Sequence, residues 1–410
     1  METPLEYWLT GEGASLLVSA KQMLDWHEND TLRAGIALRK RSPNTAPNII
    51  AEAFEILMLR KKAQAFGLWA EQGFFTRQSL EQATAPVVAR HHAERFTGCR
   101  HVLEICTGAG FDTAALARVA ERVTTIELDT RLAAMARQNL VAQGITNVQV
   151  VCGAAADVVQ TLDISLFDGC WCDPSRRNAQ GKRIENPDEY SPPLSWLQGL
   201  MPQGIAGIKI SPAANVASYL ASKQTDSNNI WAREWVGIGG ECREQVLWRG
   251  VGLRDGTAVL PDMGEIWLPP ENRIQPRVWD KPLSGLEGHY LTEPHGCIIR
   301  SGRLADFFAE REISLLDEHI AYGISEIQLP QSAWLQAFRV VEAFPFHRKT
   351  LRERILAQSW GNGIEIKKRG FPETPDDIRK WLKLPLSKNA GTVIITRVGV
   401  GHAMMLAERV

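Results

Sequence analysis

Four residues between positions 101 and 130 could together bind a charged nucleoside, to judge by their types and spacing: Glu104, Gly108, Gly110 and Glu127. Two glycines in three residues let the backbone turn tightly and approach a ligand without hindrance from a Cβ atom. A carboxylate such as Glu127 can accept hydrogen bonds from two ribose hydroxyls. The second carboxylate, Glu104, suits a cationic ligand end, such as an ammonium or a sulfonium, and is unfavourable beside a pyrophosphate.

The elements around these residues are predicted from the apolar pattern. Apolar runs at 102–106 and 123–126 predict two buried strands, and the glycine loop between them leads into a predicted helix at 113–120. Asp112 is placed to be the N-cap of that helix. Thr113 stands where the dinucleotide fingerprint G-x-G-x-x-G has its third glycine, so that fingerprint is absent. An ordinary glycine-rich turn is the alternative, although it leaves both acids unexplained.

Composition bounds the class of protein. A chain of 410 residues is expected to form more than one domain. The sequence has no apolar stretch near the ~20 residues of a membrane span, and its first residues do not resemble a signal peptide. The seven cysteines are scattered, without a C-x-x-C pair. We therefore expect no metal site, no membrane association and a reducing cytoplasm.

The pattern divides the chain into regions. Residues 1–95 predict helices, with apolar residues at helical spacing in 51–68 and with Pro86 either kinking a helix or starting a second one. Residues 96–265 alternate strand and helix, as an α/β sheet requires. A proline-rich linker is expected at 260–280. Small α+β units are expected at 266–335 and 336–410.

Another acid follows the third predicted strand of the sheet, at 147–152. A helix at 131–143, ended by Gly144, precedes this strand, and Asp157 is the nearest acid after it. Asp157 could contact an adenine amine, or it could be a helix N-cap.

The fourth and fifth predicted strands, 167–172 and 204–210, contribute residues to the same edge, because ligands bind at the carboxyl ends of parallel strands. The fourth strand ends in Asp173-Pro174-Ser175-Arg176-Arg177, and Lys209 lies late in the fifth. The proline removes a donor, which leaves the Asp173 carboxylate and nearby carbonyls to accept from a substrate N–H. Arg176 and Arg177 offer planar donors for phosphate or carboxylate. The alternative is a structural Asp–Arg pair at a turn.

Charge is distributed unevenly along the chain. From Arg339 to the end there are fourteen Lys/Arg and seven Asp/Glu, whereas residues 1–338 have an excess of eight negative charges. A basic terminal segment on an acidic body suggests a polyanionic partner. A solvated charged face is the alternative.

These features together resemble bacterial class I S-adenosylmethionine (SAM)-dependent methyltransferases that end in a THUMP-like domain. The resemblance rests on LEICTGAGFDT, IELD, DPSRR, IKISP, GECREQVLW, IEIKKRGFPETPDDIRKWLKL and TVIITR. It implies a Rossmann-like, seven-stranded α/β core at 96–265, whose last strand is antiparallel. An N-terminal helical region at 1–95 would precede the core. A ferredoxin-like unit at 266–335 and a basic THUMP-like domain at 336–410 would follow it.

The resemblance also implies roles for individual residues. The cofactor-binding residues would be Glu104, Thr107, Gly108, Gly110, Asp112, Glu127, Leu128 and Asp157. The catalytic residues would be Asp173 and Pro174, in the place of the D-P-P-Y sequence of amine methyltransferases, from which Ser175 and Arg176 depart. The substrate-binding residues would be Arg176, Arg177, Lys209, Lys367, Lys368 and Arg369.

Three functions are compatible with the sequence. The first is methyl transfer from SAM to a base of tRNA or rRNA, with the C-terminal basic module holding the RNA, since true THUMP domains bind RNA. The second is methyl transfer to a protein or small molecule, which the missing D-P-P-Y aromatic favours. The third is a non-catalytic RNA-binding protein that retains SAM as a structural or sensory ligand.

Overall fold

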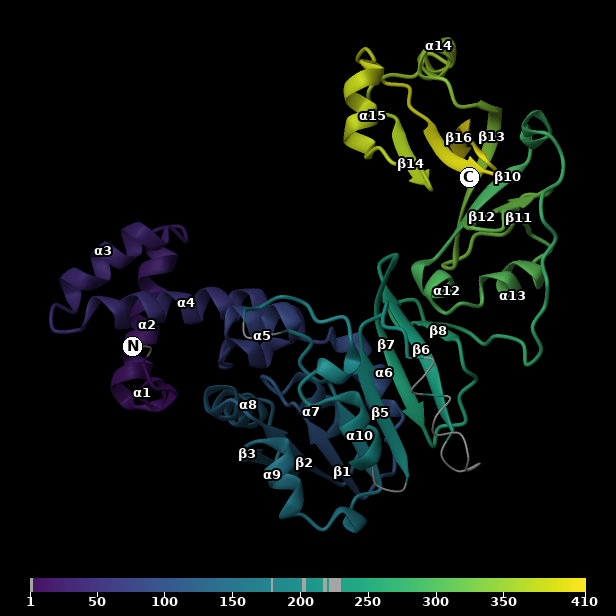
Figure 1. The fold of residues 1–410 in the computed structure, drawn as a ribbon. Coiled ribbons are helices and arrows are strands. Elements are labelled where there is room, and N and C mark those ends of the chain that lie inside the picture. Colours follow the sequence, from purple (N-terminus) through teal and green to yellow (C-terminus); the bar gives the residue numbers. More distant parts are fainter. Residues whose placement is uncertain (1–2, 178–179, 201–203, 217–219, 221–229) are drawn as a thin grey trace. The chain divides into compact units, whose positions relative to one another are not determined.

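The computed structural model describes residues 3–177, 180–200, 204–216, 220 and 230–410 (Figure 1). The chain forms two compact units. The first comprises Met1–Trp231 with Leu247–Gly252, and the second comprises Ala232–Val246 with Leu253–Val410. The four domain boundaries expected from the sequence are finer than this division and stay a prediction.

Helices make up the N-terminal part of the first unit, as the apolar spacing predicts. They are α1 (Leu5–Leu9), α2 (Gly11–Trp26), α3 (Thr31–Arg41), α4 (Pro47–Ala63), α5 (Arg77–Gln82) and α6 (Pro86–Glu94). Local chemistry defines their starts: Asp30 caps α3 through two backbone N–H groups, and Pro86 occupies the first turn of α6. Pro86 therefore starts a second helix and does not kink the first.

A parallel sheet forms the rest of the first unit. Its strands are β1 (His101–Ile105), β2 (Arg122–Glu127), β3 (Val148–Cys152), β4 (Gly169–Cys172) and β5 (Ile205–Ile210), in the order β3-β2-β1-β4-β5. The connecting helices include α7 (Phe111–Leu116), α8 (Thr130–Ala142), α9 (Ala155–Gln160) and α10 (Leu194–Leu200). All neighbours in this order are parallel, so the carboxyl ends of the strands share one edge. This is the Rossmann-like core that the sequence predicts.

Two long strands belong partly to each unit. They are β6 (Trp231–Ile238) and β7 (Glu241–Arg249), and residues 247–249 of β7 continue the first unit's sheet beside β5. In the second unit the remainder of β7 is followed by β6, β8 (Thr257–Leu260) and β9 (Glu265–Trp267). The expected linker at 260–280 is therefore partly wrong, because its first residues pair as β8 and β9.

The second unit also contains a mixed sheet. Its strands are β10 (Tyr290–Pro294), β11 (Ser314–Asp317), β12 (Ile320–Ser325), β13 (Leu335–Pro345), β14 (Glu365–Arg369), β15 (Thr392–Val398) and β16 (Gly401–Arg409), in the order β11-β12-β10-β13-β16-β15-β14. Short helices α12 (Gly296–Arg300) and α13 (Leu304–Ala309) lie between β10 and β11 in the chain. The stretches 266–335 and 336–410, which were expected to be separate modules, contribute strands to one sheet, because β10 pairs with β13.

Two helices cover one face of this sheet, α14 (Arg348–Ala357) and α15 (Pro375–Leu382). Strand β15 shows why: Val393 and Ile395 pack against these helices, whereas Ile394 belongs to the core on the other face. This alternation is the two-residue period of a strand that is buried on both faces.

Candidate active site

The glycine loop after β1 adopts a backbone that the two glycines permit. Gly108 has φ 55° and Gly110 has φ 86°, both in the left-handed region, and Gly110 is the N-cap of α7. A Cβ atom on Gly110 would lie 3.4 Å from the Cβ of Ala136 on α8. Cys106 also has a positive φ, 71°, so the strand ends one residue earlier than expected.

Glu127 closes this loop from the end of β2. Its Oε2 accepts a 2.7 Å hydrogen bond from the Gly108 backbone N–H, and its Oε1 accepts one of 2.9 Å from that of Asp129. The side chain is buried, and this burial raises the pKa of its carboxyl. Each carboxylate oxygen has a further lone-pair direction. The geometry therefore fits a carboxylate that receives ribose hydroxyls.

Glu104 lies deeper, inside the sheet. It is 1% exposed, and its Oε2 accepts a 2.5 Å hydrogen bond from the Thr113 hydroxyl. Burial raises the pKa of Glu104 to about 8. The threonine that replaces the third fingerprint glycine thus binds this carboxyl. Thr107 is buried as well, and its hydroxyl is hydrogen-bonded to that of Thr125. Direct contact of Glu104 and Thr107 with a cofactor stays a prediction.

Asp112 is not the N-cap of α7, which corrects the expectation from the sequence. It lies in the first turn, and its Oδ2 accepts a 2.8 Å hydrogen bond from the hydroxyl of Thr84. Its Oδ1 is buried, and no side chain or backbone group among the described residues donates a hydrogen bond to it. Burial is the main cause that raises the pKa of Asp112. A buried acceptor with spare capacity, next to the glycine loop, fits a cationic ligand group such as an ammonium.

The two outer cofactor residues are both exposed. Leu128 follows Glu127 and is 65% exposed, which is unusual for a large apolar side chain directly after a buried strand. Asp157 lies in the first turn of α9, whose N-cap is Ala154, so the alternative that Asp157 caps this helix is wrong. The predicted contacts of Leu128 and Asp157 with a nucleoside stay predictions.

Asp173 and Lys209 meet at the carboxyl ends of β4 and β5. Lys209 Nζ lies 2.8 Å from Asp173 Oδ2 and 2.9 Å from the Thr84 hydroxyl oxygen. Lys209 is buried, whereas the Asp173 side chain keeps 24% of its surface exposed. Pro174 is buried behind it. Asp173 thus forms an ion pair with Lys209, which is not the Asp–Arg pair that was the alternative for this turn.

The arginines after Pro174 lie on the loop that follows β4. Arg176 is half-buried, and its carbonyl accepts a 2.9 Å hydrogen bond from the backbone N–H of Ile184. Arg177 is exposed and donates a 2.8 Å hydrogen bond to the carbonyl of Gly181. Their predicted role in substrate binding stays a prediction.

The three basic residues predicted to bind substrate in the second unit are engaged on strand β14. Lys367 Nζ lies 2.5 Å from Glu293 Oε2, and Arg369 Nη2 lies 3.0 Å from Glu293 Oε1. Lys368 donates a 2.9 Å hydrogen bond to the carbonyl of Phe371. All three side chains are half-buried. The glutamate opposite them lies on β10, 74 residues away from Lys367 in the chain.

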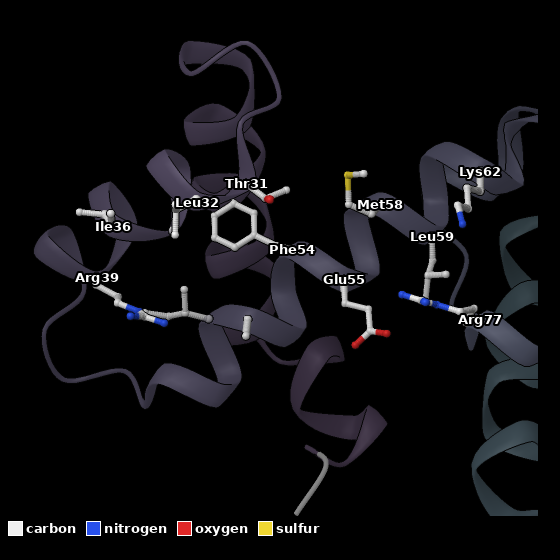
Figure 2. Close-up of a pocket in the computed structure, with 13 residues that line it drawn as sticks. Thr31, Leu32, Ile36, Arg39, Phe54, Glu55, Met58, Leu59, Lys62 and Arg77 are labelled. Atoms are coloured by element: carbon white, nitrogen blue, oxygen red, sulfur yellow. The ribbon is translucent and has the colours of Figure 1, made fainter.

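A groove of about 570 Å³ lies apart from these residues, on the N-terminal helices (Figure 2). Its lining combines apolar and basic side chains from α3, α4 and α5, among them Leu32, Ile36, Met58, Arg39, Lys62 and Arg77. None of the cofactor-binding or catalytic residues expected from the sequence lines it.

Asn139 is a buried residue whose importance was not expected from the sequence. It is fully buried on α8 and makes three hydrogen bonds, two with the backbone of Phe74 at 2.8 and 3.0 Å and one with the carbonyl of Ala109 at 2.9 Å. It therefore fastens the glycine loop to the N-terminal region. A polar residue at a core position of the predicted helix 131–143 was the available signal.

Comparison with known proteins matches two separate stretches of the chain to two families and most of its length to a methyltransferase. Residues 86–160 match the protein-L-isoaspartate(D-aspartate) O-methyltransferase family, and residues 335–409 match the THUMP domain-like family. An uncharacterized S-adenosylmethionine-dependent methyltransferase of Mycobacterium tuberculosis is 28% identical over 380 residues, which cover 89% of this chain and 96% of that protein. A protein-L-isoaspartate O-methyltransferase of Magnetococcus marinus is 53% identical, but over only 12% of this chain and 22% of its own.

A solved structure shares the fold. The crystal structure of a putative methyltransferase from Porphyromonas gingivalis W83 superposes with a TM-score of 0.69 and 19% sequence identity, covering 88% of this chain and 90% of that chain. Within the described residues, no helix is long and apolar enough to cross a membrane, and no group of three or more His, Cys, Asp or Glu side chains could hold a metal ion.

The Rossmann-like sheet, the carboxylates around the glycine loop and the likeness along nearly the whole chain lead to one conclusion. The protein is a SAM-dependent methyltransferase with a Rossmann-like core, and its C-terminal part is similar to THUMP domains.

Proposed function

We propose that this methyltransferase acts on a nitrogen of an RNA base in the cytoplasm. The observation that carries the proposal is the position of Asp173, a partly exposed carboxylate held by Lys209 at the end of β4. A carboxylate there can accept the N–H of an incoming amine and orient its lone pair. The seven cysteines are all unpaired, which suits a reducing compartment.

SAM would supply an electrophilic methyl group on a sulfonium, and the protein would supply position. Glu127 would receive the ribose hydroxyls, and the buried Oδ1 of Asp112, which accepts no hydrogen bond from the described residues, would receive the ammonium of the amino acid end. Asp173 would hold the nucleophilic nitrogen through its N–H. A target base would be turned out of its stack to reach this site.

In the second unit, exposed cations that RNA could reach lie on and after the helices α14 and α15. Because Lys367 and Arg369 share Glu293, part of their charge is compensated inside the unit. The side chains of Lys349 on α14 and Lys380 on α15 are 80% and 77% exposed, and their ion pairs, with Glu353 at 4.0 Å and Asp377 at 3.2 Å, lie on the solvent-exposed surface. Such exposed pairs are weak, so phosphates can compete for these lysines. Lys388 follows α15 and is also exposed. We infer that RNA phosphates would contact this helical face.

A carboxylate acceptor is the alternative, motivated by the local match to isoaspartate methyltransferases over residues 86–160. Asp173 pairs with the ammonium of Lys209, and Asp112 is linked to the same ammonium through the hydroxyl of Thr84, so these three ionisable groups carry a net negative charge when all are ionised. A carboxylate substrate would be repelled by such a group. This arrangement therefore favours an N–H donor.

The test is transfer of labelled methyl from SAM to total RNA from a strain that lacks this gene. The proposal is supported if the labelled product resists protease, is degraded by nuclease and does not form with the Asp173→Ala enzyme. Label that mild base releases as methanol would instead indicate a methyl ester on a carboxylate. The absence of label from RNA, in a protein that binds SAM by calorimetry, would reject an RNA substrate.

A charge comparison tests the proposed RNA surface. Lys349→Gln, Lys380→Gln and Lys388→Gln together should weaken RNA binding and lower the salt dependence of log K by up to about 2, since each single-strand phosphate contact contributes about 0.7. The matched control removes three exposed lysines from the N-terminal helices, Lys21, Lys40 and Lys61. If both triple variants weaken RNA binding equally, RNA binding depends on the total charge of the protein and not on this surface.

A further inference from the structure

Lys209 lies where it can bind and orient Asp173 but cannot reach the substrate. We propose that Lys209 is a positioning residue: it holds Asp173 in the orientation that accepts the substrate N–H, and it makes no contact with RNA. This inference rests on the acceptor role proposed above for Asp173. It replaces the substrate-binding role that the sequence suggests for Lys209.

The burial of Lys209 is the first support. The residue is 4% exposed, near the end of β5, and its ammonium lies 2.8 Å from Asp173 Oδ2. A second N–H of the same ammonium is directed to the Thr84 hydroxyl at 2.9 Å. An ammonium that is buried and donates to two protein acceptors is not available to a phosphate arriving from solvent.

The direction of the hydrogen bonds is the second support. Because an ammonium can only donate, the Thr84 oxygen accepts from Lys209, and the Thr84 hydroxyl proton is left for Asp112 Oδ2 at 2.8 Å. Each hydrogen bond in the chain Asp173–Lys209–Thr84–Asp112 thus has a defined donor, and the donors run outward from Lys209 to the two carboxylates. It joins the end of β4 to the first turn of α7, which directly follows the glycine loop.

The separation of these residues in the chain is the third support. Lys209 is 36 residues from Asp173 and 125 residues from Thr84, and Thr84 is 28 residues from Asp112. Three segments, those of Lys209, Asp173 and Thr84, therefore meet at one ammonium, and α7 is joined to it through the bond between Thr84 and Asp112. Asp173 is anchored through Oδ2, which leaves Oδ1 of the same carboxylate for the nitrogen that receives the methyl group.

The test compares Lys209→Met, Lys209→Gln and Lys209→Arg, with Thr84→Val as a variant that removes only the second hydrogen-bond partner. With total RNA from a strain that lacks the gene as substrate, Lys209→Met should lower kcat by about 100-fold, the size expected when a reacting group is displaced by about 1 Å. The KM for RNA and the calorimetric Kd for SAM should change less than threefold. Lys209→Arg should recover at least tenfold of the lost kcat, because it retains a cation.

Two results would overturn the proposal. One is a Lys209→Met enzyme with kcat within threefold of wild type. The other is a raised KM for RNA at unchanged kcat, which would mean that Lys209 binds the substrate directly. If Lys209→Met does not fold, the same criteria apply to Lys209→Gln, which keeps a donor but has no charge.

A substrate-independent measurement separates this proposal from the choice of RNA. Crystal structures of wild type and Lys209→Met with S-adenosylhomocysteine would show whether the Asp173 side chain keeps its rotamer. A rotated Asp173 in the variant supports the proposal even if RNA is never labelled, in which case only the substrate assignment fails. An Asp173 that stays in place without its cation overturns the proposal, whatever the substrate.

Discussion

Thr113 and Glu104 are joined by a 2.5 Å hydrogen bond, in which the hydroxyl at the start of α7 donates to a carboxyl inside the sheet. Burial raises the pKa of this carboxyl to about 8, so it carries a proton at neutral pH in the cofactor-free protein. The unfolded chain has the ordinary value near 4.5. Folding therefore favours the protonated form. The contribution of this group to the free energy of unfolding is at its maximum below pH 4.5 and is lost as the pH rises through 8.

Glu104→Gln tests this linkage. In the wild type the free energy of unfolding should fall between pH 5 and 8 through this group, by at most about 1.4 kcal/mol per pH unit. The variant should show a smaller decrease, because the amide does not titrate. Urea unfolding at unit steps from pH 5 to 9, without SAM, is the measurement. Identical slopes for the two proteins would contradict the raised pKa.

Glu127→Gln should weaken SAM binding about 10- to 100-fold, the size of one to two charge-assisted hydrogen bonds. The amide would place an NH₂ group against one of the two backbone N–H donors, from Gly108 or Asp129. Calorimetry with SAM measures the loss. Glu121→Gln is the control, since Glu121 is exposed before the opposite end of β2, and its Kd should stay within twofold. Equal losses of SAM affinity in both variants would show that Glu127 does not bind SAM.

Gly110→Ala should destabilise the protein by about 1–2 kcal/mol, because an L-residue in the left-handed region is strained. The new Cβ also lies 3.4 Å from that of Ala136. Gly98→Ala is the matched control: Gly98 has φ 85°, but its Cβ would point into open space. Both variants introduce a strained backbone, but only Gly110→Ala adds the contact with Ala136. The difference between their free energies of unfolding in urea therefore measures the contact. Only Gly110→Ala should also weaken SAM binding. An unaffected SAM affinity would contradict a cofactor role of this loop.

Asn139→Ala should cost about 2–4 kcal/mol of stability, because it leaves buried backbone groups of Phe74 and Ala109 without partners. The glycine loop would also lose its link to the N-terminal region, so SAM affinity should fall with stability. Thermal unfolding with and without SAM measures both effects. Gln143→Ala, at the C-cap directly after α8, is expected to change the stability by less than about 1 kcal/mol. A similar cost at both positions would show that helix propensity, and not the loop contact, is responsible.

The conformation of the glycine loop was predicted well from the sequence, because its signals are local. Gly108, Gly110, the two acids and the apolar strands lie within 27 residues, and each has a clear conformational meaning. The prediction that Asp112 is the N-cap was wrong, since the N-cap and a residue two positions later cannot be told apart without the backbone. Asp173 and Lys209 were expected at the same edge of the sheet, but the bond of Lys209 to Thr84 could not be predicted, because Thr84 lies outside the sheet and 125 residues away in the chain.

Contacts between residues far apart in the chain also explain why the RNA surface proposed for the second unit differs from the one that the sequence suggested. The charges of Lys367 and Arg369 were visible in the sequence, but their partner Glu293 lies on β10, in a stretch expected to belong to another domain. A count of charges along the chain does not show which cations are compensated. The exposed lysines of α14 and α15 could be recognised only after the sheet had fixed which face these helices present.

The pairing of β10 with β13 has a practical consequence for producing the C-terminal part by itself. A fragment that starts at residue 335, where the THUMP-like match begins, would lose β10 and leave the hydrogen-bonding edge of the eleven-residue strand β13 uncovered. Such an edge is a template for pairing with other chains. Expression trials of this region should therefore begin upstream of Tyr290, and a fragment cut at the family boundary is expected to aggregate or to exchange strands between copies.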